Sequence, residues 1–319
     1  RFVQGVVDSE DLPLNVSRES VQKNVLIEKI KSSLTLRVLK ELEFLSEQNV
    51  EKYGKFWQQY GILLKEGISS DFKNKNRLMD LLRFNSSLSE DDSPDVSLKN
   101  YVERMREEQK EIFYVTGGSR ESILHNPNLE YFKKQGLEVL YLTDQIDDFM
   151  VTDMREYDGK TLKNISQGDI EGISDSDISV PESSLSKEEQ SDILAFFKNQ
   201  LKDRVSDVSD SKRLVDSPCS LVTPKDGMTV QMEKMMKMMD RKFEGEKRNL
   251  EVNMGHPIIQ NLSEILQKDK KHPFLKDSVE QLYENSLLIE GLLDNPAQVL
   301  SRFQKFMESA SAYELEKIS

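Results

Sequence analysis

The sequence has only one cysteine, Cys219, among its 319 residues. A single thiol excludes disulfides within the chain, so we expect a reducing compartment, the cytoplasm, rather than a disulfide-stabilised secreted domain. Histidines are equally scarce and scattered, at His125, His256 and His272. Zinc and related metals are held by clusters of Cys and His, and these four residues form no such cluster in the sequence. We therefore expect no metal site.

Long apolar runs and an excess of basic residues are also missing. No apolar stretch approaches the roughly 20 residues of a membrane-spanning helix, and no signal peptide is recognisable. The chain has 57 acidic residues against 44 basic ones, for a net charge of -13. Nucleic acids and anionic membranes attract positive charge, so neither is an expected partner.

The residues that are abundant favour an elongated, helix-rich protein. Charged residues make up 32% of the chain and hydrophobic residues 37%, which suits a large exposed surface better than one compact globule. The length leaves room for two or three domains. The first residues, RFVQGVVDSEDLP, begin on a strand-like stretch that would need preceding strands to pair with. We therefore interpret the chain as the C-terminal part of a longer protein.

The first third of the chain has the periodicity of helices. Apolar residues recur every three or four positions and predict helices over 17–48, 50–66 and 73–83, the second of them ending at Gly67. At the start of the first helix, in LPLNVSRE, Arg18 places a cation at the positive end of the helix dipole. Together with free backbone N–H groups and Gln22 one turn later, it predicts an anion site, phosphate above all. The alternative is an ion pair of Arg18 with nearby Glu19 or with another acidic residue on the surface.

Residues 98–165 alternate between β-rich runs and helical patterns. Strands are expected over 110–117, 137–144 and 160–166, and helices over 119–135 and 145–158. This order predicts a small parallel sheet covered by helices. The turn GGSRES resembles half of a dinucleotide fingerprint but lacks the third glycine and the acidic ribose partner, so we interpret it as an ordinary strand-to-helix turn. A self-contained α/β enzyme with a phosphate loop here is the rival hypothesis.

A Ser- and Asp-rich segment over 166–186 is typical of a linker and is the clearest domain boundary. It ends in a capping box, Ser186 to Glu189, that starts a helix reaching Leu201. Short strands are expected around 204–214, 219–223 and 248–254.

Half of the twelve methionines lie in the stretch MTVQMEKMMKMMDR. Met228, Met232, Met235 and Met239 share one helical face, which Met236 and Met238 widen. Methionine is flexible and polarisable, so such a face can adapt to several apolar partners. The alternative is a core helix, although a core helix would normally include Leu or Ile and this one has neither.

Two helical patterns end the chain, over 273–293 and from Pro296 onwards, with Asn295 as the cap between them. A pair of helices exposes more apolar surface than it covers, so we expect a second copy of the chain to complete a four-helix bundle. Packing of the pair onto its own domain is the alternative. The expected interface residues are Leu275, Val279, Leu282, Ile289, Leu293, Val299, Phe303 and Phe306.

Four long stretches carry a family resemblance over essentially the whole chain. They are VVDSEDLPLNVSRE, SLKNYVERMREEQKEIFYVTGGSRE, GLEVLYLTDQIDDFM and YENSLLIEGLLDNP. In this order they closely resemble the heat-shock protein 90 family of chaperones. The last residues, SAYELEKIS, lack both the acidic Glu-Glu-Val-Asp tail of cytosolic eukaryotic members and an endoplasmic-reticulum retention signal, so the bacterial type is the closest match.

The resemblance implies an ATP-driven machine whose ATP and Mg²⁺ bind in a separate N-terminal domain, which is not in this sequence. Arg18 matches the arginine that reaches the γ-phosphate, Gln22 matches its companion, and Asn15 lies in the same loop. The chain alone would hold no cofactor and would not hydrolyse ATP. A passive dimeric scaffold without a nucleotide role is the alternative function.

The resemblance also implies a homodimer that binds partly folded client proteins and its own N-terminal ATPase domain. The positions that match client contacts are Phe149, Met228, Met232, Met235 and Met236. The implied fold is a helix-rich multidomain mixture of α+β and α/β parts. Its parts are the end of the large middle domain with a helical segment (1–84), a small α/β/α subdomain (85–172), a linker (173–186) and a mixed α/β dimerisation domain (187–319).

Overall fold

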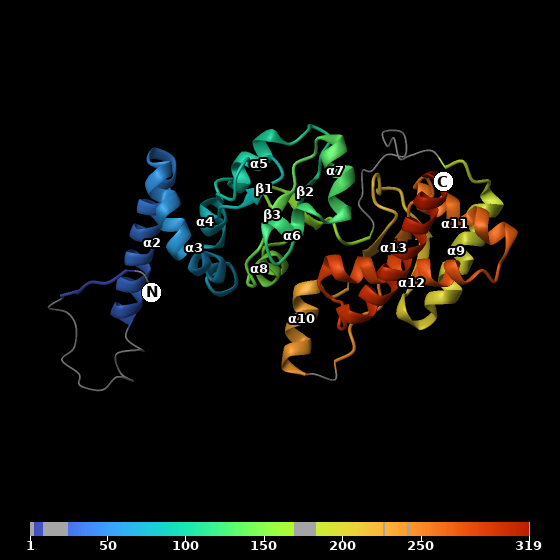
Figure 1. The fold of residues 1–319 in the computed structure, drawn as a ribbon. Coiled ribbons are helices and arrows are strands. Elements are labelled where there is room, and N and C mark those ends of the chain that lie inside the picture. The colour runs from blue at the N-terminus through green and yellow to red at the C-terminus, as the bar shows by residue number, and fades with distance from the viewer. Residues whose placement is uncertain (1–2, 9–24, 169–182, 226, 241–242, 319) are drawn as a thin grey trace.

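The computed structural model describes residues 3–8, 25–168, 183–225, 227–240 and 243–318. N-terminal helices, a small sheet with its covering helices, and a C-terminal domain follow one another along the molecule (Figure 1). The helix-rich mixture of helices and small sheets that the sequence predicts is confirmed. Residues 3–8 are exposed and form no strand, although their sequence is strand-like.

Three helices open the described chain: α2 (Val25–Gln48), α3 (Val50–Ser70) and α4 (Lys75–Leu81). The predicted end of the second helix at Gly67 is wrong, because α3 continues for one more turn and fully buries Ile68 in the core. Gly67 instead allows α4 to approach closely, since a Cβ there would lie 3.0 Å from a methyl carbon of Leu78.

The five-stranded sheet has the strand order β1-β3-β2-β5-β4. Its strands are β1 (Asn85–Ser86), β2 (Glu111–Thr116), β3 (Leu140–Leu142), β4 (Glu156–Tyr157) and β5 (Lys160–Asn164). The three central strands are parallel, as the sequence predicts, and the short edge strands are antiparallel to their neighbours. Side chains alternate across β2: Ile112 and Tyr114 face one hydrophobic core, and Phe113 and Val115 face another.

Helices cover both faces of this sheet. On one face, α8 (Asp147–Met154) and α5 (Leu98–Arg104) share a core with the N-terminal helices, so no break in packing falls between positions 84 and 85. The other face packs against α6 (Arg120–Leu124), the 3₁₀ turn η1 (Pro127–Leu129) and α7 (Glu130–Gln135).

Two of the predicted helices in this unit are shorter than expected. The single helix over 119–135 is broken in the structure because Pro127 forces the preceding Asn126 into an extended conformation, with ψ 119°. The helix over 145–158 ends at Met154, and its last residues form a hairpin instead. Asp158 and Gly159 both have positive φ, 49° and 71°, which is the geometry of a two-residue hairpin turn.

The C-terminal domain is built on a three-stranded sheet of order β6-β8-β7. It contains β6 (Asp207–Asp210), β7 (Cys219–Val222), β8 (Asn249–Val252), α9 (Lys187–Leu201), η2 (Lys202–Arg204), α11 (Pro257–Lys268) and α12 (Pro273–Glu290). The predicted capping box at α9 is confirmed, with the side chains of Ser186 and Glu189 each bonded to the other's backbone N–H. The sheet, α9, α11 and α12 enclose one hydrophobic core.

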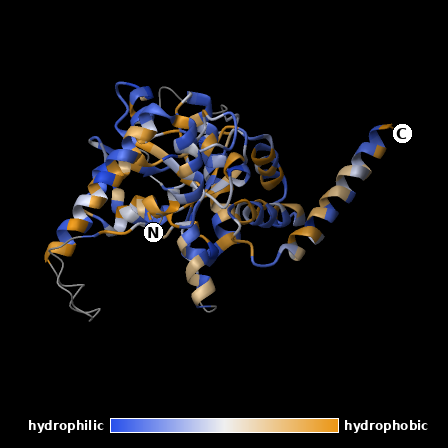
Figure 2. Cartoon of the chain, turned by 90° about the vertical axis from the view of Figure 1, so that its left-hand side faces the viewer, coloured by the Kyte–Doolittle hydropathy of each residue, from blue (hydrophilic) through white to orange (hydrophobic). Residues whose placement is uncertain are grey.

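Two helices extend from this domain. Helix α10 (Val230–Met239) lies in the long connection between the antiparallel neighbours β7 and β8 and projects from the body of the domain (Figure 1). Helix α12 ends at Gly291, whose left-handed φ of 66° suits glycine. After it, α13 (Pro296–Ile318) runs outward to the C-terminus (Figure 2).

Candidate functional site

The anion site predicted around Arg18, Gln22 and Asn15 lies outside the described residues. It remains a prediction from the sequence and from the family resemblance. The structure does describe the other predicted site residues. Most lie on α8, α10, α12 and α13, whereas the half-buried Met228 precedes α10 and Leu293 lies between α12 and α13.

Three of the five methionines of α10 lie on its outer surface. Met235, Met238 and Met239 are 40%, 83% and 78% exposed, whereas Met232 and Met236 are half-buried. Glu233 is the only buried residue among the ten of this helix. No α10 residue belongs to a hydrophobic core formed by the described residues. The core-helix alternative does not fit this arrangement.

Buried charges hold α10 against its domain. The guanidinium of Arg248, at the base of β8, lies 2.7 Å from the Glu233 carboxylate and 3.6 Å from that of Glu290. All three side chains are less than 10% exposed. Gly245 lies directly against Glu233, and a Cβ at that position would overlap the carboxylate. Helix α10 is therefore attached through its polar face, which leaves the methionine face outward.

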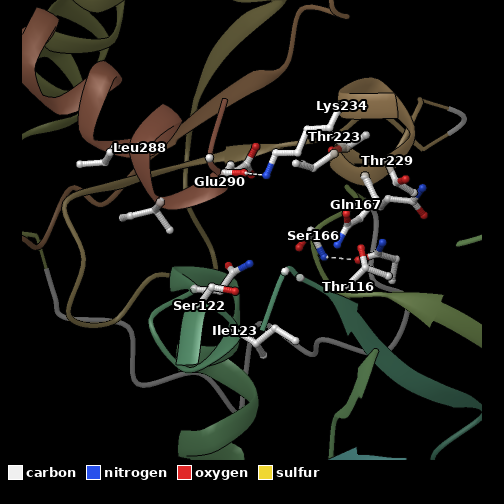
Figure 3. A pocket seen from close by; sticks show the side chains of 18 residues that line it. Thr116, Ser122, Ile123, Ser166, Gln167, Thr223, Thr229, Lys234, Leu288 and Glu290 are labelled. Carbon is white, nitrogen blue, oxygen red and sulfur yellow. Dashed lines mark hydrogen bonds between the residues drawn. The ribbon is translucent and has the colours of Figure 1, made fainter. Parts of the chain in front are cut away.

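Further polar contacts fix the two ends of α10. The Thr229 hydroxyl caps the helix by accepting the N–H of Met232 at 3.2 Å. The Lys234 ammonium donates to the Glu290 carbonyl at 2.7 Å, at the C-terminus of α12 (Figure 3). The Lys237 ammonium lies 3.3 Å from Glu233 and 3.7 Å from Asp294. These contacts tie α10 to the end of α12, immediately before the segment that leads into α13.

The buried carboxylates in this region have perturbed acidities. Burial raises the pKa of Glu290 to about 7, and the nearby positive charge of Arg248 opposes that shift. Burial likewise lowers the pKa of Lys234, against the attraction of Glu290 and Glu233. Near neutral pH, Glu290 is therefore close to its midpoint of protonation.

Phe149 lies on α8 and is 39% exposed. Its neighbour Asp148 is 2% exposed, and burial raises the pKa of Asp148 to about 6, opposed by hydrogen bonding with Thr229 and Thr116. Thr229 is the N-cap of α10 and favours the charged form of Asp148, so the start of the methionine helix lies close to α8. The structure thus places Phe149 and the methionines, about 80 residues apart in the sequence, on neighbouring elements.

A cavity of about 260 Å³ lies where the small sheet meets α10 and the end of α12 (Figure 3). Its wall includes Gly117 and Gly118 of the GGSRES turn. A Cβ at position 117 would lie 2.5 Å from a side-chain carbon of Ile123, so packing of α6 explains this glycine. The Ser119 and Ser122 side chains form a capping box that occupies N–H groups at the start of α6. This geometry is an ordinary strand-to-helix turn.

The predicted interface residues on α12 and α13 fall into two groups. Leu275, Val279 and Leu282 are 1%, 1% and 6% exposed within their own domain's core, and Val299 is also buried. These four side chains are covered within their own chain, so the expectation that a second copy covers them needs correction. A core of α9, α11, α12 and the sheet lies where the sequence pattern suggested an open helix face.

The remaining interface residues stay accessible. Ile289 and Phe303 are 40% and 51% exposed, and Leu293 and Phe306 are half-buried. Phe306 stacks edge-on against Phe274 of α12, with ring centroids 5.4 Å apart.

The outward face of α13 is broader than predicted. Leu300 and Met307, which the sequence analysis missed, are 61% and 56% exposed and share a face with Phe303. An ion pair between Arg302 and Glu284, at 2.5 Å, holds the first turns of α13 to α12. Beyond those turns the helix projects from the domain (Figure 2), and Met307, Tyr313 and Leu315 are among its exposed apolar residues.

Sequence reasoning also missed the anchor of α10. Glu233 sits among methionines and carries only the ordinary signal of a helical Glu–Lys pair, with Lys237 four residues later. Arg248 directly precedes β8 and Glu290 ends α12, and no local sequence pattern predicts that these two residues contact Glu233.

Comparisons with known proteins place these features in a family. The family model described as Hsp90 protein matches residues 1–318. The chain is 40% identical over 311 residues to the chaperone protein HtpG of Chlorobium chlorochromatii, covering 98% of this chain and 49% of the relative. It is 43% identical to HtpG of Chlorobaculum tepidum (98% and 49% covered) and 43% identical to HtpG of Geobacter sulfurreducens (91% and 45% covered). The chain spans about half the length of these curated relatives. Among the described residues, no helix is long and apolar enough to cross a membrane.

Proposed function

Because this chain belongs to the Hsp90 family, we propose that it is the client-binding and dimerising part of an ATP-dependent chaperone. In this proposal α10 offers an adaptable apolar surface to partly folded client proteins, and α13 pairs with a second copy. The middle-domain residues act on ATP held by a separate N-terminal domain.

One observation carries the client-binding proposal: α10 is attached by buried charges and turns Met235, Met238 and Met239 outward. The exposed part of an apolar side chain adds nothing to the stability of its own chain, but its burial by a partner is favourable. Methionine suits variable partners because its unbranched side chain adjusts to many shapes. Phe149 on α8, close to Thr229 at the start of α10, extends this surface to the small sheet.

The test is to replace Met235 and Met239 together with serine. Affinity for a labelled, permanently unfolded model protein should fall by roughly tenfold, because two apolar contacts are lost. The circular dichroism spectrum and melting temperature should stay unchanged, since neither side chain lies in a core. Changing both residues to leucine is the matched control and should preserve binding. Equal binding by the serine variant would place the client surface elsewhere.

We propose that dimerisation uses the exposed face of α13 with Leu300, Phe303 and Met307. Stable protein–protein interfaces bury on the order of 1,200–2,000 Å² of surface in total. A projecting helix of 23 residues with an apolar face can supply such an area when two copies pair. The pair α12–α13 from each copy would form the four-helix bundle.

The interface is tested with Phe303→Glu combined with Leu300→Glu. Two buried acidic residues per chain should disrupt the pairing and give monomers by light scattering. Lys305→Glu, an exposed position on the opposite side of the same helix, is the control and should remain dimeric. A persistent dimer of the double variant would move the interface away from α13.

We propose that Arg18 contacts the γ-phosphate of ATP, with Gln22 and Asn15 completing the loop, when the N-terminal domain closes onto this part. A guanidinium there stabilises the charge of the transferring phosphoryl group. ATP and Mg²⁺ would belong to that other domain, so this chain alone would not hydrolyse ATP. In the full-length protein, Arg18→Ala should reduce ATP turnover by roughly 100- to 1,000-fold, the usual effect of removing one donor that stabilises transition-state charge, whereas the exposed Arg37→Ala should not. Unchanged turnover in Arg18→Ala would favour the passive dimeric scaffold.

A further inference from the structure

The methionines of this chain differ sharply in their exposure to solvent. All twelve methionines lie in the described ranges. Met79, Met150, Met154 and Met254 are at most 6% exposed, and Met105 packs against a core. The exposed methionines are Met235, Met238 and Met239 on α10 and Met307 on α13. Three of the four exposed methionines thus lie together on α10, and Met228, Met232 and Met236 are half-buried.

The single cysteine does not compete with these thioethers for oxidants. Cys219 is 5% exposed on β7, and its thiol lies 3.5 Å from both the Leu282 carbonyl and the Ser286 hydroxyl. Burial raises the pKa of this thiol to about 11, so the reactive thiolate is scarce at neutral pH. Accessible redox-active sulfur is therefore concentrated on α10 and at one position of α13.

Resting on the proposed client-binding role of α10, we propose that Met235, Met238 and Met239 form an oxidation-sensitive site that releases clients when hydroperoxides convert them to sulfoxides. In each step the O–O bond of the hydroperoxide breaks and one oxygen forms a bond with the thioether sulfur. The sulfur loses two electrons, and the peroxide is reduced to water or an alcohol. A methionine sulfoxide reductase, using two thiols, reverses the reaction with release of water and a disulfide.

The attachment of α10 allows such a change without unfolding. The helix is held by Glu233, Arg248 and Glu290, and by the contact of Lys234 with the end of α12. None of these groups is a thioether, and the three methionines pack in no core of the described residues. A sulfoxide is strongly polar and keeps its water, so it removes apolar area from the surface while the helix stays docked.

Limited treatment of the 319-residue chain with hydrogen peroxide tests the proposal. Peptide mass spectrometry should find sulfoxide at Met235, Met238 and Met239 well before the four buried methionines. Affinity for the labelled, permanently unfolded model protein should fall by roughly tenfold, since each sulfoxide withdraws apolar contact. Treatment with a methionine sulfoxide reductase and its thiol donor should restore that affinity, and circular dichroism should stay constant throughout.

Two variants separate this site from others. Changing Met235, Met238 and Met239 together to leucine should preserve client binding and abolish its response to peroxide. Met307→Leu, which removes the exposed thioether on α13, should leave the response intact. If the leucine triple variant still loses affinity on oxidation, or if Met307→Leu abolishes the loss, the inference is overturned.

The failure of this inference is distinguishable from failure of the proposed function. If the protein keeps its full client affinity after the methionines of α10 are oxidised, the redox proposal is overturned and the client-binding proposal is unaffected. If the untreated protein does not bind the unfolded model protein, both the client-binding proposal and the redox proposal are overturned.

Discussion

Replacing Arg248 with leucine tests whether buried charges hold α10 in place. The guanidinium lies 2.7 Å from Glu233 and 3.6 Å from Glu290, and the Arg248 side chain is 4% exposed. Removing one member of a buried ion pair leaves an uncompensated charge and costs about 3–5 kcal/mol. Here Glu290 can remain protonated, because burial already raises its pKa to about 7. We therefore expect a loss near the lower end, about 3 kcal/mol.

The assay combines urea denaturation at pH 7 with limited trypsin digestion. Detachment of α10 should accelerate cleavage after Lys234, whose ammonium is otherwise engaged with the Glu290 carbonyl at 2.7 Å. The matched control is Lys237→Met. The Lys237 side chain is 31% exposed and its ion pairs are longer, 3.3 and 3.7 Å, so its loss should cost less than about 1 kcal/mol.

Two results would refute the reasoning. One is a free energy of unfolding for Arg248→Leu within about 1 kcal/mol of the wild-type value, with unchanged cleavage after Lys234. The other comes from a double-mutant cycle with Glu233→Gln. Because both changes disrupt the same pair, their combined cost should be clearly smaller than the sum of the separate costs, and simple additivity would mean that the pair is not coupled.

Three more predictions follow from the same domain. Burial raises the pKa of Glu290 from 4.5 to about 7, so the folded protein keeps a proton that the unfolded chain releases between those values. The free energy of unfolding should therefore fall as pH rises through that window, by up to about 3 kcal/mol. In urea titrations at pH 5 and pH 8, Glu290→Gln should remove most of this dependence of stability on pH. The same pH dependence in the variant and the wild type would contradict the prediction. Gly245→Ala should lower the melting temperature measurably, because its Cβ would overlap the Glu233 carboxylate, whereas Gly118→Ala, where nothing lies within 4 Å, should change it little. Ser186→Ala should cost about 1 kcal/mol in urea denaturation, because the N-cap of α9 is lost; no change would mean that the capping box adds nothing.

Local patterns predicted most elements of this protein and several of their boundaries. Helical periodicity and caps located α9, α10, α12 and α13, and the order of strands and helices predicted the parallel centre of the five-stranded sheet. The misplaced boundaries have local causes as well. Pro127 breaks one predicted helix, and the Asp158–Gly159 turn converts the end of another into a hairpin. Both signals were present in the sequence, but the apolar periodicity outweighed them in the prediction.

The candidate sites were predictable only in part. The methionine stripe is visible in the sequence because its members are neighbours on one helix. Its outward orientation was not visible, because it depends on Arg248 and Glu290 meeting Glu233 from two other elements. The interface prediction failed in the same way for Leu275 and Val279, since a buried helix face and an exposed one have the same periodicity.

The sequence by itself determined where helices and strands form, the family to which the chain belongs and the kind of surface that α10 can offer. These depend on residue order and on contacts within a few positions along the chain. Only the tertiary structure decided which apolar faces are covered, which carboxylate is buried beside which guanidinium, and which methionines meet solvent. Such outcomes depend on pairs of residues far apart in the chain, whose burial and charge are set by packing.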